Sequence, residues 1–336
     1  MPTKSTVVVY ATGGTIAGSA PSSTSTAVYR PGTLKVNELI EQLPELKEVA
    51  EITSKQICNL GSPDLDSEIL ILLSQQIERD LKNDAVSGVV ITHGTDTIEE
   101  TAFFLDLTIK SDKPVVLVGS MRPASALSPD GPMNLLEAVR LASCMDAKGR
   151  GTMIVLNDRI GSARFTTKMN ANRVDAFKAG DQGFLGTFEN SMPHFFYPPM
   201  RANCWRYFDI SHLDASQGLP KVNILSGHPE LEPKLFAKSI DCGAKGIVLA
   251  GMGAGCWSNE GGEAMNKVRE EGSMVPVIAS YRTAFGFVDS ADDLYGLGEW
   301  AIGGRYLNPP KCRVQLQLCL AMGFGVDEIK GVFERR

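Results

Sequence analysis

Continuous apolar runs of strand length alternate with helix-like segments along this chain, and that alternation limits the fold more than any other feature. Four such runs lie at Thr6–Ala11, Gly88–Thr92, Val115–Val118 and Thr152–Leu156. Strands that are apolar throughout are typical of sheets buried on both faces, and these are mostly parallel. The sequence therefore predicts an α/β fold with a parallel sheet between two layers of helices.

The helices expected between the runs carry apolar residues at three- and four-residue spacing. In the first part of the chain they are predicted at Ser67–Leu81, Glu99–Lys110 and Met133–Met145. A second set of strands is predicted at Lys221–Leu225, Gly246–Ala250 and Val275–Ala279, with helices at Glu232–Asp241, Gly262–Glu270 and Pro310–Met322. The second set indicates a smaller α/β domain of its own.

The domain organisation follows from length and from a change in composition. The 336 residues allow about two domains of roughly 150 residues each. The segment Met192–Gly218 is rich in proline, aromatic and polar residues and is weakly periodic, which is typical of an inter-domain connection. We predict a larger α/β domain at 1–197, a linker at 198–218 and a C-terminal α/β domain at 219–336.

Charge and hydropathy exclude several classes of partner. The net charge is -6, and no block of lysine and arginine suggests nucleic acid or an anionic membrane as a partner. No apolar run approaches the roughly 18–20 residues that span a bilayer. The N-terminus has no signal-peptide pattern, so a cytoplasmic protein is expected, or a periplasmic or secreted one if the sequence is the processed form.

The motif inventory argues against cofactors and metals. The seven cysteines form no CxxC pair, and buried reduced thiols are the expected state. Thr15 stands where a GxGxxG dinucleotide fingerprint would need glycine, and there is no Walker A, GxSxG or HExxH motif. We therefore predict no cofactor and no metal.

Four polar loops directly follow predicted strands, one of which is a short run ending at Leu60. They are Thr12–Gly18, Gly61–Asp64, His93–Thr97 and Gly119–Pro123. Ligands of open α/β sheets bind outside the carboxyl ends of the strands, where all four loops are expected to lie. Glycine, hydroxyl and carboxylate groups dominate these loops, a pattern that suits a small zwitterionic substrate.

Each signal has a plain structural interpretation when taken alone. Gly13-Gly14-Thr15 is consistent with a tight strand-to-helix turn, and His93 with a buried structural histidine. Lys168 by itself would be an ordinary surface lysine. The combination of loops carries the argument for a site, not any single motif.

Two long strings give the chain a family resemblance. Ala11–Gly18 (ATGGTIAG) and Ile91–Glu100 (ITHGTDTIEE) resemble the signature segments of the bacterial-type L-asparaginase and glutaminase-asparaginase family, in its periplasmic-type II branch. The likeness continues through Gly131–Ala138 (GPMNLLEA), Val155–Ala163 (VLNDRIGSA) and Leu307–Leu318 (LNPPKCRVQLQL), over nearly the whole chain. It implies a larger flavodoxin-like domain, a smaller α/β domain, and a homotetramer built from intimate dimers.

The resemblance also implies a role for individual residues. Thr15 matches the nucleophile, and Tyr29 matches the tyrosine of a mobile lid that contacts it. Thr95, Asp96 and Lys168 match a second set that places water and tunes proton transfer, with Lys168 able to act as a base if its pKa is lowered. The full substrate-binding set predicted from loops and resemblance is Gly14, Ser62, Pro63, Asp96, Ser120 and Asp292.

The chain departs from the family pattern at several positions. Pro63 stands where many relatives carry glutamine or glutamate, so one polar contact to the substrate's α-ammonium group is missing. Ala254 and Cys256 replace asparagines that reach the neighbouring subunit in some relatives. The acidic residue that crosses the dimer corresponds to Asp292, with Asp293 and Asp289 as alternatives.

Three functions are compatible with these observations. The first is hydrolysis of L-asparagine to L-aspartate and ammonia by a threonine nucleophile through a β-aspartyl acyl-enzyme. The second is a glutaminase-asparaginase that uses both amides. The third is an amino-acid-binding protein without catalysis, which the intact Thr15, Thr95, Asp96 and Lys168 disfavour.

Overall fold

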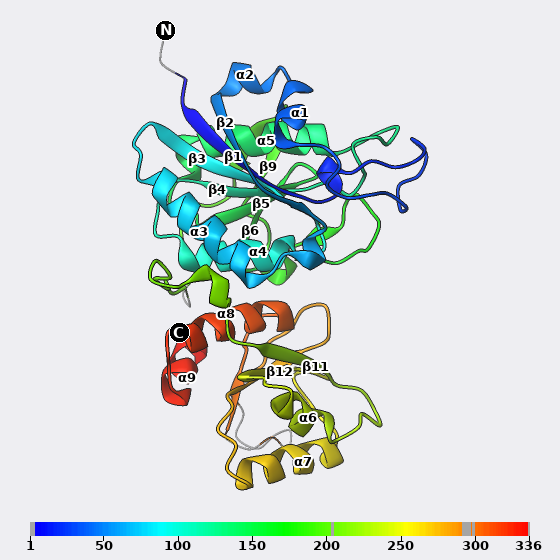
Figure 1. Ribbon diagram of the computed structural model, residues 1–336, viewed down its shortest axis with the longest axis vertical. Helices are drawn as coiled ribbons and strands as arrows, with labels where there is room; N and C mark the ends of the chain where they lie inside the picture. Colours follow the sequence, from blue (N-terminus) through cyan, green and yellow to red (C-terminus); the bar gives the residue numbers. More distant parts are fainter. Residues whose placement is uncertain (1–3, 203–204, 291–296, 298–299, 335–336) are drawn as a thin grey trace. The chain divides into compact units, whose positions relative to one another are not determined.

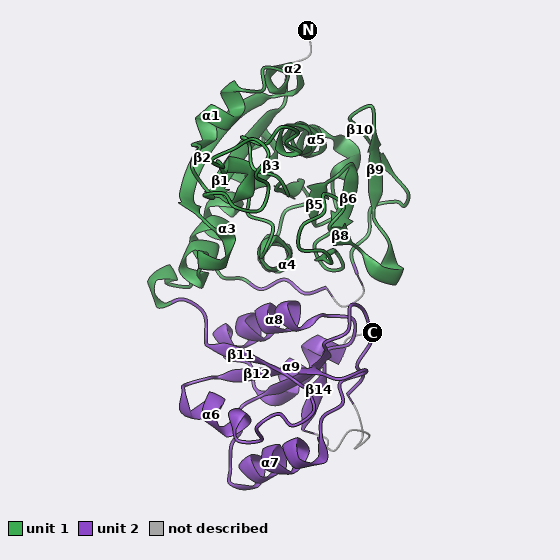
Figure 2. Cartoon of the chain, turned by 90° about the vertical axis from the view of Figure 1, so that its right-hand side faces the viewer, with its two compact units in different colours: residues 1–201, 209–217 green, residues 202–208, 218–336 purple. Residues whose placement is uncertain are grey.

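The structure is a computed structural model that describes the chain apart from residues 1–3, 203–204, 291–296, 298–299 and 335–336. The chain forms two compact units, one of residues 1–201 and 209–217 and the other of residues 202–208 and 218–336 (Figure 2). Residues 202–208 thus belong to the second unit and residues 209–217 to the first. The segment expected to be a linker is shared between the two units.

Unit 1 is built on an eight-stranded sheet with the order β10-β9-β6-β5-β4-β3-β1-β2. Its strands are β1 (Thr6–Gly13), β2 (Glu51–Leu60), β3 (Val86–Thr92), β4 (Val115–Val118), β5 (Thr152–Leu156), β6 (Arg159–Ser162), β9 (Gly186–Glu189) and β10 (Met192–Phe195). The pairs β2–β1, β1–β3, β3–β4 and β4–β5 are parallel, as expected from their apolar sequences. The remaining pairs are antiparallel.

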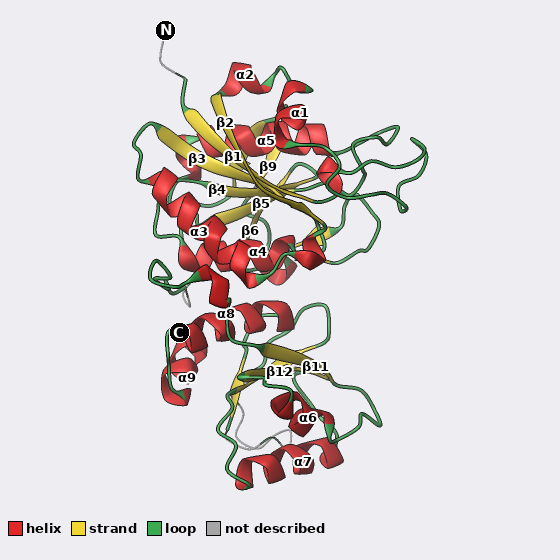
Figure 3. Ribbon diagram, viewed as in Figure 1, coloured by secondary structure: helices red, strands yellow, loops and turns green. Residues whose placement is uncertain are grey.

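Helices cover both faces of this sheet (Figures 1 and 3). They are α1 (Val36–Glu41), α2 (Leu46–Val49), α3 (Ser67–Leu81), α4 (Ile98–Thr108) and α5 (Gly131–Ser143). Helices α3 and α4 lie on one face, and α5 lies with α1 and α2 on the other (Figure 1). Central strands are buried throughout, which explains their unbroken runs of valine, leucine and isoleucine.

The antiparallel part of the sheet was not expected from the sequence. Strand β5 turns directly into β6 through Asn157 and Asp158, whose φ angles of 52° and 57° are left-handed. Two consecutive left-handed residues form the tight turn that matches the twist of a hairpin, and asparagine and aspartate tolerate it. In addition, the first four residues of Met192–Gly218 are not part of an irregular connection but form β10.

A separate two-stranded ribbon carries one predicted site residue. It consists of β7 (Thr167–Lys168) and β8 (Phe177–Lys178), and it is not part of the eight-stranded sheet. Lys168 pairs with Phe177 across the ribbon. A ribbon this short cannot hold its own position, so its contacts with the rest of unit 1 determine where Lys168 lies.

Unit 2 contains a four-stranded parallel sheet with the order β11-β12-β13-β14. Its elements are β11 (Val222–Ser226), α6 (Leu235–Asp241), β12 (Gly246–Gly251), α7 (Asn259–Glu270), β13 (Val277–Tyr281), β14 (Ala301–Gly303), α8 (Pro309–Ala321) and α9 (Val326–Glu334). A core around Ile247, Leu249 and Trp257 packs on this sheet. Among the described residues, no helix has the length and apolar character needed to cross a membrane.

The strand order of unit 1 determines where a ligand can bind. Strand β1 lies between β2 and β3, so the chain leaves β1 toward one side of the sheet and later returns on the other side. The order β2-β1-β3-β4-β5 is that of the flavodoxin-like fold, in which this reversal opens a crevice at the carboxyl ends of the first and third strands. The loop after β1 begins with Gly14, and the loop after β3 begins with His93.

Candidate active site

The loop after β1 presents Thr15 at the start of a short 3-10 turn, Thr15–Ala17. Gly13 and Gly14 precede it with φ angles of 107° and 79°, which side chains other than glycine rarely adopt. The Thr15 residue is only 5% exposed. Its hydroxyl oxygen lies 2.7 Å from the Tyr29 hydroxyl, so one of the two donates to the other.

Glycine at two positions lets three loops meet. A Cβ atom added to Gly14 would lie 2.3 Å from the backbone nitrogen of Gly94, in the loop after β3. A Cβ atom on Gly94 would lie 2.8 Å from the hydroxyl oxygen of Ser62, in the loop after β2. The loops after β1 and β3 are therefore in direct backbone contact at the topological reversal, and the Ser62 side chain of the loop after β2 packs against Gly94.

Thr95, Asp96 and Lys168 form a hydrogen-bonded set beside this junction. The Lys168 ammonium donates to the Thr95 hydroxyl at 2.8 Å and to an Asp96 carboxylate oxygen at 2.6 Å. The Lys168 side chain is 14% exposed, whereas that of Asp96 is 63% exposed. Because Thr95 accepts from Lys168, its own hydroxyl hydrogen is available to another acceptor.

His93 is a structural neighbour of this set. Burial lowers its pKa to about 4, so the ring is neutral near pH 7. Its Nδ1 lies 2.7 Å from the Gly94 carbonyl and its Nε2 lies 2.9 Å from the Thr101 hydroxyl. A carbonyl only accepts, so the proton is on Nδ1 and Nε2 accepts from Thr101. The structural role expected for His93 is confirmed.

The loop after β4 approaches from the other side of Thr95. A Cβ atom on Gly119 would lie 3.0 Å from the Thr95 methyl carbon. The Ser120 side chain is fully buried, and its hydroxyl donates to the Arg122 carbonyl at 2.7 Å. The Ser120 hydroxyl thus stabilises its own loop, and the backbone of this loop is the part adjacent to Thr95.

Helix α5 fixes that loop through two polar side chains that sequence reasoning did not single out. The Asp130 carboxylate accepts from the backbone nitrogens of Met121 and Arg122 at 2.9 Å each. Asn134 is buried and donates to the Gly119 carbonyl at 3.0 Å. Both residues lie within the GPMNLLEA string or next to it, but only the fold shows which backbone groups they hold.

The segment 19–30 is a loop whose two ends lie side by side. Ser19 and Arg30 exchange backbone hydrogen bonds of 3.0 and 2.8 Å, and the loop between them extends outward as the blue loop in Figure 1. The Ser125 hydroxyl accepts from the Ala20 backbone nitrogen at 2.8 Å. Tyr29 stands at the returning end of this loop, which explains why it reaches Thr15.

Ser62 and Pro63 lie in the 3-10 turn Ser62–Asp64 after β2. Ser62 is buried, and Thr97 donates to its carbonyl at 2.9 Å. Pro63 and Asp64 are exposed. Pro63 offers neither an N–H nor a polar side chain to a ligand. Asp64 is the residue of this turn that carries a carboxylate.

The acidic residue predicted to cross the dimer is only partly described. Asp292 and Asp293 lie outside the described residues. Asp289 is exposed, and its carboxylate forms an ion pair with Arg305 at 3.0 Å. Ala254 and Cys256 lie in the tight loop after β12, where Met252 and Cys256 pair with each other.

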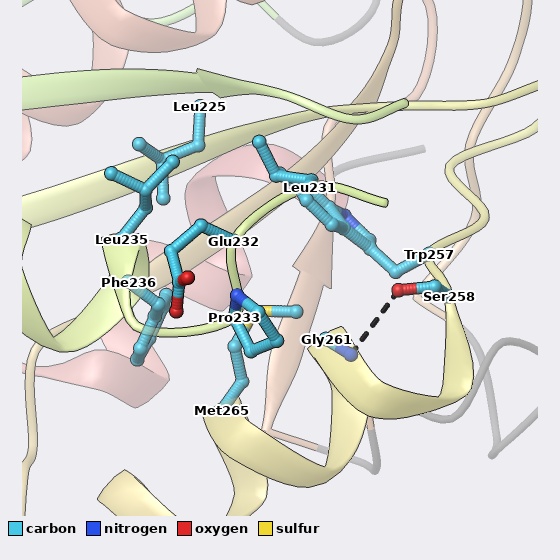
Figure 4. A pocket seen from close by; sticks show the side chains of 10 residues that line it. All are labelled: Leu225, Leu231, Glu232, Pro233, Leu235, Phe236, Trp257, Ser258, Gly261 and Met265. Carbon is cyan, nitrogen blue, oxygen red and sulfur yellow. Dashed lines mark hydrogen bonds between the residues drawn. The ribbon is translucent and has the colours of Figure 1, made fainter. Parts of the chain in front are cut away.

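Other possible sites are less developed. No group of three or more metal-ligating side chains occurs among the described residues. Unit 2 has a small pocket between the end of β11, α6 and the start of α7, lined mainly by Leu225, Phe236, Trp257 and Met265 (Figure 4). None of the predicted site residues lines this pocket, and its lining is largely apolar.

Comparison with known protein families decides between the remaining classes of protein. Residues 6–201 match the family model "Asparaginase, N-terminal", and residues 221–333 match "Glutaminase/Asparaginase C-terminal domain". The chain belongs to the asparaginase family. It is a hydrolase of that family, with the α/β architecture that its sequence predicted.

Individual relatives support the same assignment. L-asparaginase 2-1 of Saccharomyces cerevisiae is 50% identical over 97% of this chain and 89% of that protein. Glutaminase-asparaginase of Acinetobacter glutaminasificans is 39% identical over 98% of this chain and 99% of that protein. The structure of a protein described as a probable cytoplasmic L-asparaginase from Campylobacter jejuni matches with a TM-score of 0.91 and 40% identity, covering 99% of this chain and 100% of that one.

Proposed function

We propose that this asparaginase-family protein hydrolyses L-asparagine to L-aspartate and ammonia through a β-aspartyl ester on Thr15. The observation that carries the proposal is the pair of hydroxyl groups of Thr15 and Tyr29, 2.7 Å apart at the topological reversal of the sheet. A threonine hydroxyl needs a neighbouring acceptor for its proton when it attacks, and the Tyr29 oxygen is within reach.

The first half of the reaction forms the ester. The Thr15 oxygen attacks the side-chain carbonyl carbon of asparagine while its proton passes to the Tyr29 oxygen and the Tyr29 hydroxyl gives its own proton toward the leaving nitrogen. The C–N bond then breaks, and the nitrogen leaves as ammonia after it receives a proton. Backbone N–H groups of the glycine-rich loops are suited to the oxyanion, and each such donor is worth about 3 kcal/mol in other acyl-transfer enzymes.

The second half of the reaction hydrolyses the ester, and we assign it to the set of Thr95, Asp96 and Lys168. The Thr95 hydroxyl accepts from Lys168 at 2.8 Å, so its hydrogen can be donated to a water oxygen. Water attacks the ester carbon and gives a proton to the Tyr29 oxygen, while the Tyr29 hydroxyl gives its own proton to the departing Thr15 oxygen; the ester bond breaks and both hydroxyls are restored. Lys168 acts here as an ammonium group that polarises Thr95, rather than as the base considered from sequence.

Substrate recognition uses the other loops in this proposal. Gly14 and the Ser120 loop contribute backbone groups, and Ser62 contributes a buried hydroxyl to the α-carboxylate. The exposed Asp96 carboxylate attracts the α-ammonium group. Because Pro63 lacks a polar contact, the longer and less well held glutamine loses more than asparagine does, and a methylene alone is worth about 1–3 kcal/mol. We therefore expect a strong preference for asparagine.

The mass of the trapped intermediate tests the assignment of the nucleophile. In Thr95→Val, the acyl group should load onto Thr15 and persist, because its hydrolysis is slowed. Intact-mass spectrometry after an acid quench, followed by peptide mapping, locates the adduct. In Thr15→Ala, turnover should be lost while aspartate still binds. An adduct on Thr95 in Thr15→Ala, with turnover retained, would reverse the two roles.

A second candidate function is a glutaminase-asparaginase with little preference between the amides. The observation in its favour is the 39% identity with the glutaminase-asparaginase of Acinetobacter glutaminasificans. An ammonia-release assay with asparagine and glutamine separates the two candidates. Comparable kcat/KM values for both amides would support this second function.

We further propose a homotetramer of the type II branch whose smallest active form is a dimer. In this proposal Asp292, or its neighbour Asp293, enters the partner's site; Asp289 is less suitable because Arg305 already pairs with it. A fully active monomer in analytical ultracentrifugation at assay concentration would contradict this.

The cytoplasm is the proposed compartment, which fractionation of cells expressing the gene would test.

A further inference from the structure

The residue next to Lys168 makes a hydrogen bond that the proposed reaction does not use. Thr167 is buried, and its hydroxyl donates to a carboxylate oxygen of Glu99, which is also buried. Glu99 lies in the first turn of α4, four residues after Thr95 and three after Asp96. Adjacent residues of the β7–β8 ribbon thus bind adjacent parts of the α4 N-terminus.

The two sets of bonds differ in what happens to them during turnover. The bonds from Lys168 to Thr95 and Asp96 involve groups that exchange protons or meet substrate. The bond from Thr167 to Glu99 involves no reacting atom. Because the ribbon is outside the main sheet, a bond of this second kind keeps Lys168 in place while its own partners change.

The burial of Glu99 also has an electrostatic consequence. A buried carboxylate is costly unless it is hydrogen-bonded or compensated, and here it is stabilised by the Thr167 hydroxyl and by the positive end of the α4 dipole. Its negative charge lies at the same helix end as Lys168's partners.

The other charged groups around Lys168 are already paired or directed elsewhere. Asp96 pairs with Lys168 itself at 2.6 Å. Opposite Lys168 on β8 stands Phe177, and the next residue, Lys178, pairs with Asp175. Glu100, which follows Glu99 on α4, is half-buried and is a matched comparison for its charge.

We infer that Glu99 is a positioning residue for the proposed reaction: through Thr167 it holds Lys168 against Thr95. This inference rests on the proposed asparaginase function. It assigns no contact between Glu99 and substrate. Its consequence is a loss of kcat without a matching loss of substrate binding.

Two substitutions at Thr167 test its hydrogen bond to Glu99. Thr167→Val removes the hydroxyl at nearly constant volume and leaves the charge. It should lower kcat for asparagine about 10- to 100-fold, while aspartate affinity measured by calorimetry changes little. Thr167→Ser restores the hydroxyl and should recover most of the activity. Unchanged kcat in a folded Thr167→Val would overturn the inference, as would failure of Thr167→Ser to recover activity.

The acceptor is tested by Glu99→Gln, which retains an oxygen that accepts from Thr167 and should therefore keep most of the kcat that Thr167→Val loses. Glu100→Gln changes the neighbouring residue of the same helical turn and should leave kcat unchanged. A loss of kcat in Glu99→Gln as large as that in Thr167→Val, or an equal loss in Glu100→Gln, overturns the inference. If the unmodified protein releases no ammonia from asparagine, the proposed function fails instead.

Discussion

Both units contain parallel strands joined by helices, yet the predicted catalytic groups that the structure describes gather in only one of them. In unit 1, β1 lies between β2 and β3, so successive connections leave it in opposite directions. In unit 2, the order β11-β12-β13-β14 follows the chain, and each connection continues in the same direction. A reversal of strand order leaves a crevice at the carboxyl ends, whereas a sequential order does not.

The loops at the carboxyl ends reflect this difference. After β12, the chain folds on itself through the Met252–Cys256 pair, and Gly251 accepts from the Arg282 backbone nitrogen at 2.9 Å. After β1 and β3, by contrast, two loops meet through Gly14 and Gly94 and carry Thr15 and Thr95. Glycine-rich loops therefore indicate a site only where the topology brings loops from separate strands together.

The largest expected effect breaks the contact between those loops. Gly14→Ala forces a side chain into a left-handed φ of 79° and places its Cβ 2.3 Å from the Gly94 nitrogen. We expect a loss of activity of roughly 100-fold or more, because a misplacement of about an ångström in an active site costs that much. The measurement is the rate of ammonia release, normalised to folded protein by circular dichroism.

Gly243→Ala in unit 2 is the matched control for that substitution. Gly243 has a φ of 88°, and nothing lies within 4 Å of an added Cβ. The Gly243→Ala variant should lose about 1–2 kcal/mol of stability through backbone strain alone. Its kcat should be unchanged. Equal loss of activity in both variants would show that backbone strain, and not loop contact, limits the site.

Removal of a single hydroxyl sharpens the comparison. Tyr29→Phe deletes the oxygen that faces Thr15 at 2.7 Å, and kcat should fall about 100-fold with a smaller change in KM. Tyr281→Phe deletes a hydroxyl that donates to the Tyr306 carbonyl in unit 2 and should cost only about 1 kcal/mol of stability. Steady-state kinetics and denaturant titration on both variants test this. A Tyr29→Phe enzyme with normal kcat would remove Tyr29 from the proposed proton transfer.

Acid should weaken unit 1 through His93. Burial lowers the pKa of its folded form to about 4 from an ordinary 6.5, so below 6.5 the unfolded chain binds the proton and the folded chain does not. Stability is therefore full above pH 6.5 and falls as the pH drops toward 4, by about 3 kcal/mol in total. Denaturant midpoints between pH 4 and 7 measure this.

Two histidine variants identify the source of that slope. His93→Gln keeps a donor and an acceptor but does not titrate, so the slope between pH 4 and 7 should decrease. His228 in unit 2 is exposed, and His228→Gln should leave the slope as it is. An unchanged slope in His93→Gln would mean that other groups cause the acid sensitivity.

The smallest effect is expected in the pocket of unit 2. The Trp257 indole N–H is buried and has no hydrogen-bond partner among the described residues. Trp257→Phe removes this N–H together with some packing, so the two effects offset each other and stability should change by no more than about 1 kcal/mol. Activity should be unchanged. A large loss of asparagine hydrolysis would show that this pocket is coupled to catalysis.

Local patterns in the sequence were sufficient to predict most of the elements. The bounds of β4, β5 and α3 agree with the prediction, because unbroken apolar runs and helical spacing report directly on burial. Strand β2 was recognised only as a short run ending at Leu60, since this strand at the edge of the sheet is largely exposed. The final helix α9 was not predicted.

The sequence by itself determined the α/β class, the polar loops after the strands and the family resemblance, because these depend on residues close together in the chain. It did not determine which distant groups touch. Lys168 and Thr95 are 73 positions apart, and Thr167 and Glu99 are 68 apart. The tertiary structure decided these contacts, because they depend on strand order and on the placement of a short ribbon. Neither strand order nor the placement of the ribbon leaves a periodic pattern in the sequence. Packing between elements, and not local conformation, brings such groups within hydrogen-bond distance.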